Sequence, residues 1–275
     1  MSVDTSSYYP EVNPPDGDKK DSLNERKISL FGDETSNFAE DTSAADDNNR
    51  ENITENKNSP HQHLSKKEGW IKAADICSHF LSWGLVPLLM PVFGIIFIFR
   101  LSVLDVISPG MQTAFIFIIA GINLFVPMLL IILLKALGIV QDLGLNGQKE
   151  RAIPYIITAL CYGASAWFMA MRGAPVWVSM FFAGGGLASI INLIINRRWK
   201  ISAHAAAIAG IIALLIRLEK DVAVEPQLFL WLLITVGAAG LLGSARIWLG
   251  RHTVWQVMAG YLVGFCSVFF LMAIH

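Results

Sequence analysis

The sequence predicts an all-α membrane protein, a multi-span helix bundle of about seven spans with a disordered N-terminal tail. Of the 275 residues, 54% are hydrophobic and only 16% are charged, and the apolar residues come in long blocks. This composition is too apolar for an ordinary soluble domain. Residues 1–69 differ sharply, since they hold 15 acidic and 8 basic residues against 7 and 13 in the remainder. We therefore expect two parts, an acidic tail at 1–69 and a transmembrane domain at 70–275.

The tail is rich in Asp, Asn, Glu, Ser and Lys and holds few apolar residues. Such a segment cannot bury enough apolar surface to offset the entropy lost on ordering, so we predict that it is disordered. Cys77, Cys161 and Cys266 lie singly within apolar runs and are expected to be small buried hydrophobic residues. Their number and spacing predict neither a disulfide framework nor a zinc site.

The transmembrane part is predicted to begin with interfacial anchors at Trp70 and Lys72, followed by a first span over about 76–99. Pro87 and Pro91 fall inside this span and are expected to kink it. The second span, about 113–134, contains no charged residue and is long enough to cross a hydrocarbon core of roughly 30 Å. Further apolar runs predict five more spans, at about 154–171, 175–195, 205–216, 228–242 and 254–274.

The polar connections after the second, fourth and sixth spans carry clusters of bases. Each is separated from the next by two crossings, so all three emerge on one face of the membrane, together with the N-terminal tail. Charge at the edge of a bilayer-length apolar segment is costly unless it has a partner or a function. Three loops that gather cations on one face predict an anion-binding site. The charged and histidine residues concerned are Lys149 and Arg151, then Arg197, Arg198, Lys200 and His204, then Arg246, Arg251 and His252.

These residue types suit phosphoryl chemistry. The planar guanidinium group of Arg246 or Arg151 matches the oxygens of a phosphate, and Lys149 adds a point charge. One neutral imidazole can attack phosphorus while a second, protonated, imidazole donates to the leaving oxygen. His252 and His204 are the only histidines within the three clusters.

Three short segments resemble the signatures of the type 2 phosphatidic acid phosphatase superfamily. Arg246 and His252, separated by five residues, resemble the third signature, whose histidine is the nucleophile. The segment Ile-Ser-Ala-His at 201–204 is similar to the second signature, Pro-Ser-Gly-His, whose histidine is a general acid. Lys149 and Arg151 resemble a shortened first signature. The resemblance covers about 113–274.

The resemblance implies a six-helix core and a phosphatase that needs neither metal nor cofactor. It makes His252 the nucleophile, His204 the general acid, and Arg246, Arg151, Lys149 and Ser202 ligands of the substrate phosphate. The family has an aspartate four positions after the nucleophile, where this chain has Gln256. A glutamine can accept a hydrogen bond from the imidazole, so it is the candidate for orienting the nucleophile, but it brings no negative charge.

We therefore expect an integral membrane, multi-pass phosphatase that hydrolyses a lipid or polyprenyl phosphate through a phosphohistidine intermediate. Its partners are then a lipid phosphate and membrane lipids, and no nucleic acid. The alternative is a weak or inactive relative that binds anionic lipid or scaffolds membrane partners. A small transporter is a third possibility, but the spans show no repeated pair of interrupted helices. The lipid, the membrane face that carries the site and the oligomeric state stay open.

Overall fold

A computed structural model describes residues 71–79, 87–138, 152–221 and 226–274. These residues form helices and short turns, and the described ranges contain no strand, which confirms the all-α prediction. Residues 65–275 belong to one compact unit. The disorder expected for residues 1–69 concerns positions outside the described residues. From residue 87 onward the elements follow in the order η2 (Pro87–Leu89), α3 (Met90–Leu101), η3 (Val103–Val106), α4 (Pro109–Ala120), η4 (Gly121–Phe125), α5 (Val126–Ala136), α6 (Ala152–Met171), α7 (Val176–Asn196), α8 (Ala203–Asp221), α9 (Pro226–Trp248) and α10 (Val254–Ala273).

Among the described residues, five helical stretches are long and apolar enough to cross a membrane. They are Pro109–Ala136, Ala152–Met171, Val176–Asn196, Gln227–Trp248 and Val254–Ala273. Two further elements were also predicted as spans. Residues Pro87–Leu101 form a shorter apolar helix, and α8 ends in four charged residues within its last five positions. The chain is therefore a multi-pass membrane protein built as a helix bundle.

The first predicted span, about 76–99, runs across residues 80–86, which are outside the described residues. The structure describes a helical stretch at 71–79 and, from Pro87 onward, the 3₁₀ turn η2 that leads into α3. Pro91 lies in the first turn of α3, so it does not kink the middle of that helix. The physical reason is that proline lacks an N–H group and has a preset φ, which suits the first turn of a helix.

The second predicted span is one unbroken helical rod that contains the π-helical turn η4 between α4 and α5. Asn123 lies in this turn and is almost fully buried. Its amide nitrogen donates to the carbonyl of Ile119 at 3.0 Å and to the hydroxyl of Ser165 at 2.6 Å. Because Ser165 belongs to α6, this bond links the rod to the next helix inside an otherwise apolar contact.

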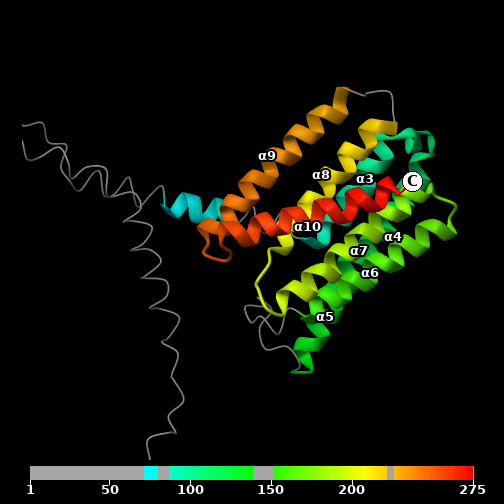
Figure 1. The fold of residues 1–275 in the computed structure, drawn as a ribbon. Coiled ribbons are helices and arrows are strands. Elements are labelled where there is room, and N and C mark those ends of the chain that lie inside the picture. The colour runs from blue at the N-terminus through cyan, green and yellow to red at the C-terminus, as the bar shows by residue number, and fades with distance from the viewer. Residues whose placement is uncertain (1–70, 80–86, 139–151, 222–225, 275) are drawn as a thin grey trace, which may run out of the picture. The chain divides into compact units, whose positions relative to one another are not determined.

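Helix α10 lies against both α7 and α8, while α6 packs on α7 and α9 packs on α8 (Figure 1). Glycines permit the close approach of α10. A Cβ at Gly264 would overlap the backbone of Ala206 in α8, and one at Gly184 in α7 would lie 2.7 Å from the Cα of Val268. Small residues at helix contacts let backbones approach closely. The position of α10, and with it the start of that helix, is therefore fixed against two neighbours.

Successive helices alternate in direction, so α6, α8 and α10 all begin at the same end of the bundle (Figure 1). The helical stretch at 71–79 also reaches this end, where Trp248 Nε1 donates to Asp75 Oδ1 at 2.8 Å. Trp248 is the last residue of α9. The connections between α7 and α8 and between α9 and α10 thus meet on one face, as the counting of spans predicted.

Candidate active site

The turn between α9 and α10 holds the third cluster of polar residues. Helix α9 ends at Trp248, and Gly250 adopts a left-handed conformation with φ of 63°. This conformation is accessible to glycine at little cost and reverses the chain. The backbone N–H groups of Arg251 and His252 both donate to the carbonyl of Arg246, at 3.1 and 3.3 Å. The helix end therefore brings Arg246 and His252 together across the turn.

Helix α10 begins directly after His252 with a capping box. The hydroxyl of Thr253 accepts from the N–H of Gln256 at 3.4 Å, and the Gln256 side-chain oxygen accepts from the N–H of Thr253 at 3.1 Å. The two bonds satisfy backbone donors that helix starts leave unpaired. Gln256 thus has a structural part in fixing the helix start beside His252.

The second cluster is positioned by the start of α8. Ser202 is fully buried, and its hydroxyl accepts from the N–H of Ala205 at 3.4 Å, in the manner of an N-cap. Its own N–H donates to the carbonyl of Gln256 at 3.2 Å. This bond fastens the start of α8 to the first turn of α10. His204, the second residue of α8, is held beside the turn that carries His252.

A pocket of about 230 Å³ lies where these elements meet. It brings together three residues that the sequence predicted for the site, His204, Arg246 and His252. His252 is buried, with 7% of its surface exposed, whereas His204 and Arg246 are half-buried. The remaining lining residues are Pro87, Leu88, Ile131, Pro154, Tyr155, Thr158 and Ala203.

The pocket favours an anion for two reasons. Arg246 supplies a fixed positive charge with several N–H donors. In addition, Pro154, Ala203 and His252 place the N-terminal ends of α6, α8 and α10 on its wall. Helix N-termini carry partial positive charge, so three of them together favour a phosphate-sized anion.

Four further residues were predicted for the site. Lys149 and Arg151 are outside the described residues, so their part in phosphate binding stays a prediction. Ser202 and Gln256 are not among the residues that line the pocket, and the bonds above use their polar groups in capping helices. Among the described residues, no group of three or more His, Cys, Asp or Glu side chains could hold a metal ion.

Sequence reasoning missed part of the pocket wall. Tyr155 and Thr158 lie three residues apart on α6 and face the pocket, but in the sequence they stand within an apolar run. The available indication in the sequence was Pro154, which follows the basic residues Lys149 and Arg151 and marks the start of a helix at the site. Pro87 and Leu88 could not be found, since their segment was assigned to the middle of a span.

The fold and the site define a multi-pass membrane helix bundle with a pocket lined by arginine and histidine at one end. Residues 155–275 match the model of the PAP2 superfamily, so this part of the chain is a PAP2 superfamily domain. The match extends from the first turn of α6 through α10 and includes the pocket residues His204, Arg246 and His252. No curated protein and no solved structure matches the chain at a significant level. Members of the superfamily are typically metal-independent phosphatases.

Proposed function

We propose that the protein is an integral membrane phosphatase that hydrolyses a lipid or polyprenyl phosphate, a monoester or diphosphate. The observation that carries this proposal is the single pocket lined by His204, Arg246 and His252 within a PAP2 superfamily domain. A pocket at the helix ends lies at the surface of the membrane, so it admits a headgroup while the hydrocarbon chain stays in the lipid. Leu88 and Ile131 give the pocket an apolar wall beside its charged one.

In the proposed reaction, an imidazole nitrogen of His252 attacks phosphorus and the bond from phosphorus to the ester oxygen breaks. His204, protonated, gives its proton to the departing oxygen, and the lipid leaves as an alcohol or, from a diphosphate, as a monophosphate. A water molecule then attacks the phosphohistidine, loses a proton to His204 and releases inorganic phosphate. Arg246 and the three helix N-termini stabilise the negative charge that develops on the phosphoryl oxygens.

The test is phosphate release from a panel of lipid phosphates by the purified protein without added metal. We expect His252→Ala to lower the rate of phosphate release by about 10³-fold or more. Losses of this size follow removal of the nucleophile from serine hydrolases. Arg251→Ala is the matched control, because this neighbouring residue is exposed and does not line the pocket. An unchanged rate in His252→Ala would overturn the assignment.

A second candidate is a relative that binds anionic lipid with little or no turnover. It is supported by Gln256, which stands where the family has an aspartate and whose side-chain oxygen accepts a bond from Thr253 at the start of α10. A neutral amide cannot stabilise an imidazolium ion as a carboxylate does. This candidate predicts that the protein binds vesicles containing lipid phosphate but releases no phosphate above the His252→Ala background.

A further inference from the structure

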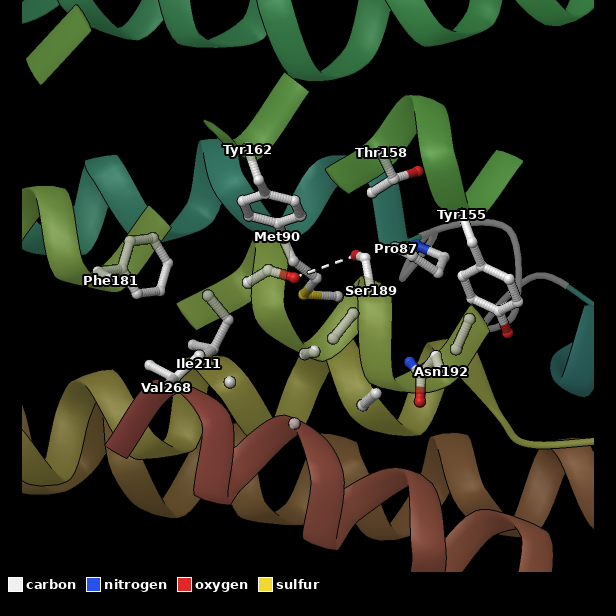
Figure 2. Close-up of a pocket in the computed structure, with 17 residues that line it drawn as sticks. Pro87, Met90, Tyr155, Thr158, Tyr162, Phe181, Ser189, Asn192, Ile211 and Val268 are labelled. Carbon is white, nitrogen blue, oxygen red and sulfur yellow. Dashed lines mark hydrogen bonds between the residues drawn. The ribbon is translucent and has the colours of Figure 1, made fainter. Parts of the chain in front are cut away.

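A second, smaller cavity adjoins the phosphate pocket. It lies between α6, α7, α8 and α10 and has a volume of about 70 Å³ (Figure 2). Pro87, Tyr155, Thr158 and Ala203 line both spaces, so a side chain's thickness separates them. We call this cavity the inner chamber. A group bound in it is therefore next to the pocket lined by Arg246 and His252.

The polar atoms of the inner chamber include hydrogen-bond acceptors. Asn192 on α7 is 3% exposed, and its Oδ1 atom accepts no hydrogen bond from the described residues. Ser189, one turn earlier, donates its hydroxyl hydrogen to the carbonyl of Gly185 at 3.0 Å. Thr158 donates its hydroxyl hydrogen to the carbonyl of Pro154 at 2.7 Å. Both hydroxyl hydrogens are therefore already used in bonds to the backbone of their own helices.

A buried acceptor without a donor costs free energy, so the chamber favours a ligand that brings one. A hydroxyl group suits Asn192, because it can donate to Oδ1 and can accept from the amide N–H groups, whereas a phosphate dianion has no hydrogen to give Oδ1. The two spaces are thus complementary, one for an anion and one for a hydrogen-bond donor. Figure 2 shows Asn192 and Ser189 on α7, and Thr158 and Tyr155 on the neighbouring helix α6.

We propose that the inner chamber, through Asn192, binds a hydroxyl group of the substrate close to its phosphate ester, and so selects hydroxylated lipid phosphates over polyprenyl phosphates. This inference rests on the proposed function and names its substrate class. The chamber has room for a few water-sized groups but not for a hydrocarbon chain. It therefore accepts a polar substituent, and the chain of the lipid lies outside it.

The experiment compares 1-oleoyl-glycerol 3-phosphate with its 2-deoxy analogue, which lacks the free hydroxyl and is otherwise matched. For the wild-type protein we expect kcat/KM to favour the hydroxylated lipid by about five- to tenfold, the range of one buried hydrogen bond. Asn192→Leu keeps the volume and removes the acceptor, so it should bring the ratio to about one. Thr158→Val, a change of nearly equal shape, should lower the ratio in the same direction but by less.

Asn123→Leu is the matched control, since this residue is also a buried asparagine whose Oδ1 accepts no bond within the described part of the chain. It does not line either space, so the ratio should stay as in the wild type. If Asn192→Leu slows both lipids equally, the chamber holds only structural water and the inference is overturned. Equal rates on both lipids in the wild type would also overturn it while leaving the phosphatase proposal standing.

The same two lipids are also compared by binding to His252→Ala protein, which does not depend on turnover. A binding preference for the hydroxylated lipid that disappears on adding Asn192→Leu supports hydroxyl binding in the inner chamber. If the wild-type protein then releases no phosphate, the catalytic proposal alone fails. Equal binding of the two lipids by the His252→Ala protein contradicts the chamber's role. Binding of neither lipid contradicts both proposals.

Discussion

Two half-buried arginines at opposite ends of the bundle show how position decides what a charge can do. Arg217 lies near the C-terminal end of α8, and its guanidinium donates to the carbonyl of Met272 at 3.1 Å, near the end of α10. Arg246 lies near the C-terminal end of α9 but lines the pocket at which α6, α8 and α10 begin. The same residue type therefore faces helix C-terminal carbonyls in one place and helix N-termini in the other.

Electrostatics gives the two positions different consequences. The last carbonyls of a helix carry partial negative charge, so a cation beside them stabilises the fold and leaves little potential for a ligand. Helix N-termini carry partial positive charge, so a cation beside them adds to a field that only an anion can neutralise. We therefore expect a structural role for Arg217 and a role in phosphate binding for Arg246. Four sets of variants test these roles and the helix start beside His252.

Among these variants, the largest effect is expected from Arg246→Lys. The substitution keeps the charge but removes the planar pair of donors that matches phosphate oxygens, so phosphate release should fall by about 10²-fold. Arg217→Lys is the paired control and should leave kcat within about twofold. The measurement is steady-state release of phosphate from detergent micelles. Equal losses in the two variants would mean that the distinction between the two ends is wrong.

The next effect is expected at Gln256. Gln256→Asp should raise phosphate release by roughly tenfold, because a carboxylate near His252 stabilises the imidazolium ion that forms during the reaction. Gln256→Glu is the companion variant, since glutamate preserves the capping box with Thr253 and also adds charge. A rate that stays at background in both variants would favour the lipid-binding candidate over an attenuated enzyme.

A moderate effect on stability, without an effect on catalysis, is expected from Arg217→Leu. The substitution removes a charge-assisted bond to Met272 and should lower the free energy of unfolding by about 1–2 kcal/mol. The thermal denaturation midpoint in detergent should fall by a few degrees while kcat per folded molecule is unchanged. A drop in kcat with an unaltered midpoint would place Arg217 in the catalytic machinery instead.

The smallest effect is expected from Thr253→Ala, which removes the N-cap of α10. Loss of such a cap costs about 1 kcal/mol. Because Thr253 follows His252 directly, the variant should also slow phosphate release modestly, by roughly twofold to fivefold, on the scale of that free energy. Thr253→Ser retains the hydroxyl and should behave as the wild type in both the denaturation and the release measurement.

The sequence determined the class of the molecule and the chemical identity of the pocket. Long apolar runs must be helical in a membrane because every backbone polar group has to be bonded within the segment. Alternation of direction then places the connections near His204 and His252 on one face without any knowledge of packing. Five predicted spans have the length and composition of a crossing, and the PAP2 domain contains the histidines and arginine found by spacing.

Only the tertiary structure decided which residues line the pocket and which contacts the neighbouring side chains make. Hydropathy cannot tell a proline that kinks a helix from one in its first turn, as Pro91 is in α3, and it gave no sign that Pro87 lines the pocket. Spacing cannot show that Asn192 lacks a described donor, because that depends on contacts between helices distant in sequence. The capping box of Thr253 and Gln256 is by contrast a local contact at the start of α10. Residue type set the chemistry, and the close packing of α10 on α7 and α8 set the geometry.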